Sequence, residues 1–300
     1  MRPNRGGSLR LLRVAGIDVF VHWSWLLVAI VEIKSRSGHF RSLVWNVLEY
    51  LTMFAVVLMH EFGHALACRQ VGGRADQIVL WPLGGVAFVT PPARPGATLW
   101  SIAAGPLVNL VLLAATVAAL ALVPVGHSDL SLFLRSFAFI NAGLFLFNIL
   151  PIYPLDGGQI LRALLWFVVG RATSLTVAAG LGLVAVVSLL GVAVVRGSLW
   201  LGVMAIFAIL SCWRGLGRAR ALARLAQLPR REGFTCPACK SAPPMAPLWS
   251  CSQCHQLFDT FLTHATCPNC SFVFDTTACP DCSQAHPISA WSTETGGPTD

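Results

Sequence analysis

The chain has 300 residues, of which 55% are hydrophobic and only 11% are charged, and its mean hydropathy is +0.68. A soluble domain normally carries about a quarter of charged residues, so this composition and the near-continuous apolar runs exclude a soluble protein and indicate an integral membrane protein. The net charge of +8 comes mostly from clustered arginines. We interpret these clusters first as indicators of orientation in the membrane, and only second as binding sites for partners.

The first apolar segment, residues 17–33, is predicted to be a retained membrane span. It contains Asp18, His22 and Glu32, and no small-residue cleavage site follows it, so it does not fit a cleaved signal peptide. His22 is expected to anchor this span near the membrane interface, together with neighbouring tryptophans. Residues 43–70 then predict a second, longer apolar helix.

A segment rich in Gly and Pro comes next, and residues 78–90 within it are strand-like on both sides of Gly84 and Gly85. A membrane tolerates such backbone only where it is buried in protein or lines a cavity. We therefore expect a re-entrant β-hairpin.

Further helices are predicted at 98–123, 131–150, 173–195 and 198–213, with a semi-polar helix at 158–171. Asn109 and Asn141 lie in these apolar helices, where an interhelical hydrogen bond is the expected role. The predicted fold class is an all-α polytopic membrane protein of about six transmembrane helices with a re-entrant β-hairpin, plus a small carboxy-terminal zinc-ribbon module. The predicted domains are a transmembrane domain at 1–213, a basic juxtamembrane linker at 214–233, a double zinc ribbon at 234–286 and a disordered tail at 287–300.

The arginines predict the orientation of the chain in the membrane. Residues 214–231 hold six arginines and no acidic residue, and they are expected to form a juxtamembrane helix at the lipid headgroups rather than a nucleic-acid contact. With six spans, both termini are predicted to be cytosolic in a multi-pass cell-membrane protein. Arginines 2, 5, 10 and 13 before the first span support this orientation, whereas Lys34, Arg36 and Arg41 in the first outer loop weigh against it.

The stretch LMHEFGHALA places His60, Glu61 and His64 inside the second apolar helix. Residues i and i+4 share one face of a helix, so the two imidazoles can hold one metal ion, and Glu61 is close enough to reach a water molecule bound there. Each ionisable group costs roughly 2.5–3.5 kcal/mol in a membrane, and metal ligation compensates this cost better than a polar packing cluster does. The pattern predicts a zinc site with a built-in general base.

Zinc in a catalytic site needs a third protein ligand. The candidate acids downstream are Asp76, Asp129 and Asp156. Asp156 is the best of them, because it follows a helix broken by prolines at membrane depth, and a broken helix is tolerated only around a cavity. A role of Asp156 as the N-cap of the helix at 158–171 remains open beside this one.

The chain resembles the site-2 protease family of intramembrane zinc metalloproteases over roughly residues 14–215. The resemblance is carried by HEFGH, the two-glycine hairpin, AGPLVN at 104–109 and NILPIYPLDGG at 148–158. It implies zinc bound by His60, His64 and Asp156, with Glu61 as catalytic base and acid. It also implies that Asn148 helps to bind the substrate or its oxyanion, and that the hairpin at 78–90 with Gly84 and Gly85 lines the substrate path.

The function that follows is intramembrane endopeptidase activity on transmembrane or membrane-associated proteins. Zinc would lower the pKa of water toward about 7, and Glu61 would remove the proton and later deliver one to the leaving amine. The alternative is a non-enzymatic metal carrier or transporter with a zinc-ribbon interaction module. A transporter favours an internal repeat or polar groups spread across the bilayer, whereas here the polar groups converge on one place.

Eight of the ten cysteines form four C-x-x-C knuckles in the last quarter of the chain. This pattern predicts two structural Cys₄ zinc sites in addition to the catalytic zinc, and a cytosolic location favours metal over disulfides. Pairing the first knuckle with the second and the third with the fourth gives the shortest loops. Few cations lie near the knuckles, so the expected partner is a protein regulator and nucleic acid is unlikely. The predicted ligands are Cys236, Cys239, Cys251, Cys254, Cys267, Cys270, Cys279 and Cys282.

Overall fold

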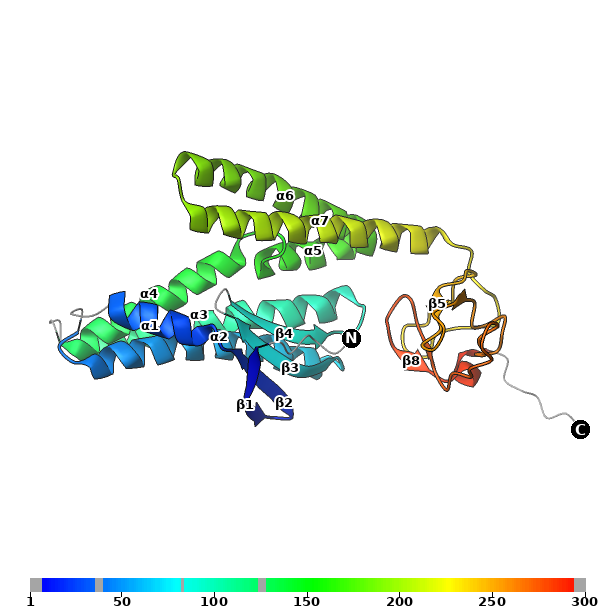
Figure 1. Ribbon diagram of the computed structural model, residues 1–300, viewed down its shortest axis with the longest axis horizontal. Helices are drawn as coiled ribbons and strands as arrows, with labels where there is room; N and C mark the ends of the chain where they lie inside the picture. The colour runs from blue at the N-terminus through cyan, green and yellow to red at the C-terminus, as the bar shows by residue number, and fades with distance from the viewer. Residues whose placement is uncertain (1–6, 36–39, 82–83, 124–127, 294–300) are drawn as a thin grey trace, which may run out of the picture. The chain divides into compact units, whose positions relative to one another are not determined.

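The computed structural model describes residues 7–35, 40–81, 84–123 and 128–293 (Figure 1). This part of the chain forms two compact units, and the boundary between them in the sequence lies between residues 217 and 218. The orientation arguments from Arg2, Arg5 and Arg36 fall outside the described residues.

Six helices, α2 to α7, account for most of the first unit's described residues, and a shorter helix, α1, precedes them. Five of them are long and apolar enough to cross a membrane by length and composition, whereas the fourth in order, α5, has only 14 residues. The helices predicted from the sequence are confirmed, and the last one continues well beyond the predicted end at residue 213. The helices are α2 (Leu43–Gln70), α3 (Pro95–Leu122), α4 (Asp129–Ile149), α5 (Asp156–Val169), α6 (Arg171–Val195) and α7 (Leu199–Gln227).

Local sequence signals fix where several of these helices begin. The hydroxyl of Ser42 accepts a hydrogen bond from the Val44 N–H at the start of α2, and Ser128 does the same for Ser131 at the start of α4. Helix α3 begins at Pro95, where the missing N–H costs nothing.

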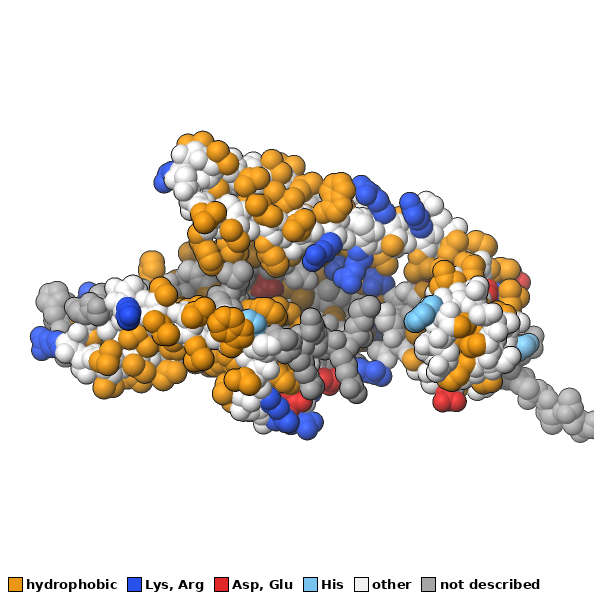
Figure 2. Space-filling model, in the orientation of Figure 1, with side chains coloured by type: hydrophobic (Ala, Val, Ile, Leu, Met, Phe, Trp, Pro, Cys, Tyr) orange, Lys and Arg blue, Asp and Glu red, His pale blue; other side chains and the backbone are white. Residues whose placement is uncertain are grey.

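The long helices carry apolar side chains on their outer surfaces. Val111 on α3, Val184 on α6 and Phe207 on α7 are 67%, 68% and 55% exposed. Hydrophobic side chains cover much of the helical surface visible in Figure 2. Exposed apolar surface on this scale fits a protein whose solvent is lipid.

A four-stranded sheet packs against α2. Its strands are β1 (Ser8–Val14), β2 (Ile17–His22), β3 (Arg74–Trp81) and β4 (Gly84–Thr90), in that spatial order, and only β2 and β3 are parallel. Fully buried Ile17, Val19 and Ile78 pack here with Ala65 and Cys68 of α2. The hairpin predicted around Gly84 and Gly85 is present as β3 and β4, and its re-entrant position in the membrane stays a prediction. The all-α fold class is wrong because this hairpin is half of a mixed sheet.

The predicted span at 17–33 is not one continuous helix. Its first residues form β2, and only then does a helix begin, α1 (Trp25–Ser35), whose 11 residues are about 16 Å long. At one end of this segment, Arg69 from the last turn of α2 donates to the Gly16 carbonyl, and further along the Tyr50 hydroxyl donates to the Trp25 carbonyl. Strand β2 and helix α1 together therefore run antiparallel to α2 over most of its length.

The second unit begins inside α7, at Arg218, and continues to a short 3₁₀ helix, η1 (Ile288–Trp291). Two small two-stranded sheets lie between them: β5 (Trp249–Ser250) with β6 (Leu257–Phe258), and β7 (Thr277–Ala278) with β8 (Ala285–His286).

The core of the second unit reaches beyond the predicted ribbon boundaries. Trp291 is fully buried and packs edge-on against Phe261, so the predicted disorder at 287–300 is wrong for residues 287–293, and residues 294–300 lie outside the described chain. Arg230 and Arg231, predicted to be linker residues, form ion pairs of 2.6 and 2.7 Å inside this unit.

Candidate metal centres

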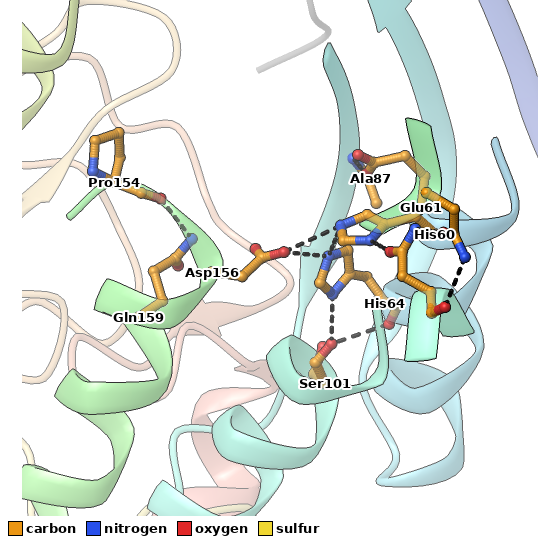
Figure 3. A network of polar contacts seen from close by, with 10 residues as sticks. His60, Glu61, His64, Ala87, Ser101, Pro154, Asp156 and Gln159 are labelled. Carbon is orange, nitrogen blue, oxygen red and sulfur yellow. Dashed lines mark hydrogen bonds and ion pairs between the residues drawn. The ribbon is translucent and has the colours of Figure 1, made fainter. Parts of the chain in front are cut away.

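Helices α2 and α5 bring three metal-ligating side chains together (Figure 3). His60 and His64 lie one turn apart on α2, and their Nε2 atoms are 3.0 Å from each other. The Oδ2 atom of Asp156, in the first turn of α5, lies 3.0 Å from Nε2 of His60 and 3.2 Å from Nε2 of His64. All three side chains are at most 13% exposed. The structure thus brings together the three residues predicted to bind zinc.

The spacing and chemistry of these atoms fit a zinc ion. Ligand atoms about 2.0–2.2 Å from a tetrahedral zinc lie about 3.3–3.6 Å apart, a little more than the 3.0–3.2 Å seen here. Nδ1 of His64 lies 2.9 Å from the Ser101 carbonyl, which can only accept, so Nδ1 carries the proton and the lone pair of Nε2 faces Asp156. A carboxylate oxygen and imidazole lone pairs at this distance repel one another unless a cation lies between them.

The segment PIYPLDGG determines where Asp156 lies. A Cβ on Gly157 would be 2.2 Å from the Ile149 carbonyl oxygen, and one on Gly158 would be 2.3 Å from the Tyr153 nitrogen. Only glycines therefore allow α5 to begin so close to the end of α4. Leu155 occupies the N-cap position and Asp156 faces the imidazoles, which decides against the N-cap role for Asp156.

The other two candidate third ligands lie elsewhere. The side chain of Asp76 is 84% exposed on β3 and forms an ion pair with Arg69. Asp129, at the start of α4, accepts a hydrogen bond from the Arg41 backbone.

Glu61 lies beside this centre and is held by the sheet. Its side chain is buried, and Oε2 accepts a hydrogen bond of 2.8 Å from the backbone N–H of Ala87 in β4. Strand β4 is the last strand of the sheet, so this N–H lies on the edge that β3 does not occupy. An ideal Cβ on Gly85 would be 2.3 Å from Cγ of Glu61, so the glycine allows the strand to approach the carboxylate.

Some predicted site residues make no contact with the three ligands. Asn148 is half-buried in the last turn of α4, and its side chain forms no hydrogen bond within the described chain. Gly84 has open space around its Cβ position and a φ of +137°. His22, which was expected to anchor the first span and not to belong to the site, stacks on Trp81 with ring centroids 4.5 Å apart.

The sequence reasoning missed several residues that hold the site. The backbone carbonyl of Ser101 holds His64, and the backbone N–H of Ala87 holds Glu61. Backbone contacts of this kind leave no signal in a sequence. The side chain of Asn109 forms a hydrogen bond with His60. Interhelical hydrogen bonds were expected for Asn109 and for Asn141 without named partners, and the structure shows that the two side chains bond to each other at 2.7 Å. The signal that could have linked Asn109 to the metal site is its place in AGPLVN, a motif that also carries the family resemblance.

Comparison with known proteins agrees with this geometry. Residues 49–128 and 124–192 match the model of peptidase family M50. This match, over just under half of the chain, is to the M50, or site-2 protease, family. The solved site-2 protease from Methanocaldococcus jannaschii superposes with a TM-score of 0.51 at 26% identity, covering 70% of this chain and 95% of the other.

Two similar curated relatives have names that refer to zinc and proteolysis. A zinc metalloprotease of Methanocaldococcus jannaschii is 31% identical over 58% of this chain, and the putative zinc metalloprotease Rip3 of Mycobacterium tuberculosis is 33% identical over 58%. The chain spans about half the length of these relatives, 50% and 47% respectively.

Beyond the M50 match, the second unit gathers its eight cysteines into two clusters of four. The first knuckle meets the fourth, with sulfurs 3.7 Å apart, and the second meets the third, at 3.5 and 3.6 Å. The predicted pairing of neighbouring knuckles is therefore wrong, because the second and third knuckles form an inner site that brings the outer two together. The clusters are Cys236, Cys239, Cys279 and Cys282, and Cys251, Cys254, Cys267 and Cys270.

These distances fit zinc rather than disulfides. Sulfurs about 2.3 Å from a tetrahedral zinc are about 3.8 Å apart, whereas a disulfide bond is about 2.05 Å long. Hydrogen bonds from the Asn269 side chain and the Gln256 backbone lower the pKa of the Cys254 thiol to about 6. Burial raises the pKa of the Cys279 thiol well above its usual range, so in that cluster a cation is needed to stabilise the thiolates.

All four knuckles share one backbone turn. In each, the first cysteine's carbonyl accepts a hydrogen bond from the residue four positions later, and that residue adopts a left-handed conformation. His255 occupies this position after the second knuckle, with a φ of 59°, and belongs to neither cluster. The left-handed residues are Lys240, His255, Ser271 and Ser283.

Proposed function

We propose that this chain is an intramembrane zinc metalloendopeptidase that hydrolyses peptide bonds of membrane-embedded or membrane-associated proteins, the reaction type of regulated intramembrane proteolysis. The observation that carries the proposal is the convergence of His60, His64 and Asp156, from two helices, beside the carboxylate of Glu61. A carboxylate next to a three-ligand zinc site is the arrangement that metal-assisted peptide hydrolysis requires.

The chain's own residues supply binding and proton transfer. His60, His64 and Asp156 would hold the zinc ion, which would supply Lewis acidity to acidify water and polarise a peptide carbonyl. Glu61 takes the proton from the attacking water and delivers it to the leaving amine. The hydrogen bond from the Ala87 N–H leaves one oxygen of Glu61 available for this transfer and fixes the direction in which it points.

The edge of β4 is the proposed substrate-binding site. A helical substrate hides its carbonyls in i to i−4 bonds and must unwind locally before it can be cleaved. The strand edge that carries the Ala87 N–H faces Glu61, so an extended peptide added to this edge would lie next to the catalytic carboxylate. Gly84 and Gly85 form the start of this edge, and Asn148 is proposed to bind the substrate or its oxyanion.

Six traverses of the membrane are proposed, with both termini in the cytosol. Helices α2, α3, α6 and α7 each cross once, α4 followed by α5 makes one crossing, and β2 followed by α1 makes the first. An even number of crossings places both ends on one side, and the arginine-rich segment at 214–231 assigns that side to the cytosol. A cleavable tag at either terminus should therefore be protected from protease added outside intact cells and cut after lysis.

Two structural zinc ions are proposed for the cysteine clusters, in addition to the catalytic one. The nested clusters would hold a small module without a large core, as structural zinc does elsewhere. This module is proposed to bind a protein regulator rather than nucleic acid.

The decisive experiment compares the full-length wild type with Glu61→Gln and Asp156→Asn, reconstituted with a tagged membrane peptide. Glu61→Gln should lower cleavage by roughly 10²- to 10⁴-fold because the general base is lost, while its zinc content stays at the wild-type level. Asp156→Asn should lose both cleavage and one equivalent of zinc. Normal cleavage by Glu61→Gln would remove the peptidase assignment, and zinc transport by that variant would favour a carrier.

A further inference from the structure

We propose that Asn109 and Asn141 fix the tautomer of His60, so that Nδ1 carries the proton and Nε2 presents a lone pair to the metal. They are positioning residues for a metal ligand, and the proposal rests on the zinc site proposed above. Both asparagines are completely buried, one on α3 and one on α4, and neither helix supplies a side chain that ligates the metal.

Three hydrogen bonds connect the two asparagines to His60. The Asn141 Nδ2 atom donates to the backbone carbonyl of Asn109 at 2.8 Å. The Asn109 Nδ2 atom donates to Oδ1 of Asn141 at 2.7 Å, and Oδ1 of Asn109 lies 2.5 Å from Nδ1 of His60.

The direction of each bond follows from the backbone carbonyl at the end of this relay. A carbonyl oxygen can only accept, so the NH₂ group of Asn141 must face it and the Oδ1 atom of Asn141 must face Asn109. That oxygen in turn requires the NH₂ group of Asn109, which leaves Oδ1 of Asn109 facing His60. An amide oxygen also only accepts, so Nδ1 of His60 carries the proton and its Nε2 is free to bind a metal.

Reversing the Asn109 amide would reverse this outcome. Its NH₂ group would then face Nδ1 of His60, and a neutral imidazole would carry its proton on Nε2, where it blocks the metal position. The reversed amide would also place an oxygen against Oδ1 of Asn141. Because both side chains are fully buried, no bulk solvent is available to relieve these contacts. Asn141 therefore locks the orientation of Asn109.

The two histidines are held in different ways. Nδ1 of His64 meets the Ser101 carbonyl directly and needs no side chain to orient it. Only His60 depends on side-chain amides, so substitutions at Asn109 and Asn141 should weaken the metal site through one ligand. Partners that hold the second nitrogen of a ligating histidine typically change metal affinity 10- to 100-fold.

The test measures zinc affinity of the full-length protein in detergent by competition with a chromophoric chelator. Asp156→Asn identifies which equivalent of zinc belongs to this site rather than to the cysteine clusters. For that equivalent, Asn109→Leu should bind zinc roughly 10- to 100-fold more weakly, and Asn141→Leu should change it in the same direction. Asn109→Asp keeps an oxygen acceptor for Nδ1 but places its second oxygen against Oδ1 of Asn141, so it should bind zinc more tightly than Asn109→Leu and more weakly than the wild type.

Thr116→Val is the matched control. Thr116 is a buried polar residue of the same helix, but its hydroxyl donates only to the Leu112 carbonyl of α3. The Thr116→Val protein should keep the zinc affinity of the wild type, even if the substitution changes its thermal stability. Zinc affinity lowered equally by Thr116→Val and Asn109→Leu, or unchanged in Asn109→Leu, would overturn the relay. If Asp156→Asn released no zinc, the proposed zinc site itself would fail.

Discussion

Strand β4 passes close to the Glu61 carboxylate at Gly85. Any Cβ there would lie 2.3 to 2.6 Å from three atoms of the Glu61 side chain. The neighbouring Gly84 has nothing within 4 Å of its Cβ position, although its φ of +137° disfavours other residues. The two glycines therefore have different roles: Gly85 makes room for Glu61, and Gly84 allows the turn.

Gly85→Ala should lower cleavage at least tenfold with zinc content unchanged, because the new methyl group displaces the Glu61 carboxylate rather than a metal ligand. Gly84→Ala should mainly lower the free energy of unfolding, by about 1–2 kcal/mol from backbone strain. Cleavage of the tagged peptide, zinc content and thermal unfolding of both variants distinguish these effects. Equal loss of cleavage in both would show that turn geometry, not the Glu61 contact, is what matters.

At this scale the sequence predicts the metal ligands but not the residues that orient them. His60, Glu61 and His64 are predicted from helix periodicity, and Asp156 from its place after a helix that prolines break at membrane depth. The contact between His60 and Asn109 joins positions 49 residues apart, and the contact with Ala87 is made by backbone. Neither local spacing nor residue type reports such pairs.

Among the elements, α6 and α7 hold the segment that carries Asp156. The thiol of Cys212 in α7 donates to the Tyr153 carbonyl at 3.0 Å. A Cβ on Gly182 of α6 would lie 2.8 Å from the same carbonyl oxygen, and one on Gly215 of α7 would lie 2.9 Å from the Tyr153 ring. Helices that contribute no ligand thus determine the position of the loop three residues before Asp156.

Gly182→Ala should weaken zinc binding at the catalytic site and lower the free energy of unfolding by about 1–3 kcal/mol, because the added methyl group pushes against backbone. Gly180→Ala, two residues away on the same helix, meets no atom within 4 Å and should be neutral or stabilise the helix by up to about 1 kcal/mol. Zinc affinity and thermal unfolding of the two proteins measure the difference. Identical behaviour would show that the α6 contact does not position Asp156.

The helices were predictable as elements because long apolar runs leave little choice in a membrane. The strand at 17–22 was not. Its run IDVFVH is as apolar as a helix start, and periodicity alone does not separate the two over so few residues. Its parallel partner β3 begins only at Arg74, so the information that makes it a strand lies far away in the chain.

For the molecule as a whole, the order in which the knuckles pair decides how the second unit is closed. Loop length favours neighbouring knuckles only weakly, since each doubling of a loop costs about 0.6 kcal/mol. Packing easily outweighs this difference: fully buried Trp291 joins the carboxy-terminal end of the unit to Phe261 in its middle. The ligand types were therefore predictable from the sequence, whereas their partners were not.

Double substitutions test this pairing. Cys236→Ser with Cys279→Ser removes two ligands of one cluster and should release one equivalent of zinc, whereas Cys236→Ser with Cys251→Ser damages both clusters and should release two. Cys68→Ala, outside both clusters, should release none. Metal analysis of the purified proteins gives the count, and the opposite result for the two double variants would restore the pairing of neighbouring knuckles.

The pairing of β2 with β3 imposes an order on how this chain is made. Backbone groups in hydrocarbon need partners, and those of β2 find them in β1 and in a strand that is translated only after α2. An 11-residue helix is also too short to be integrated alone as a span. In the proposed topology, the crossing made by β2 and α1 therefore waits for later segments, and α2 is the earliest of the five long apolar helices of the described chain that could be integrated alone.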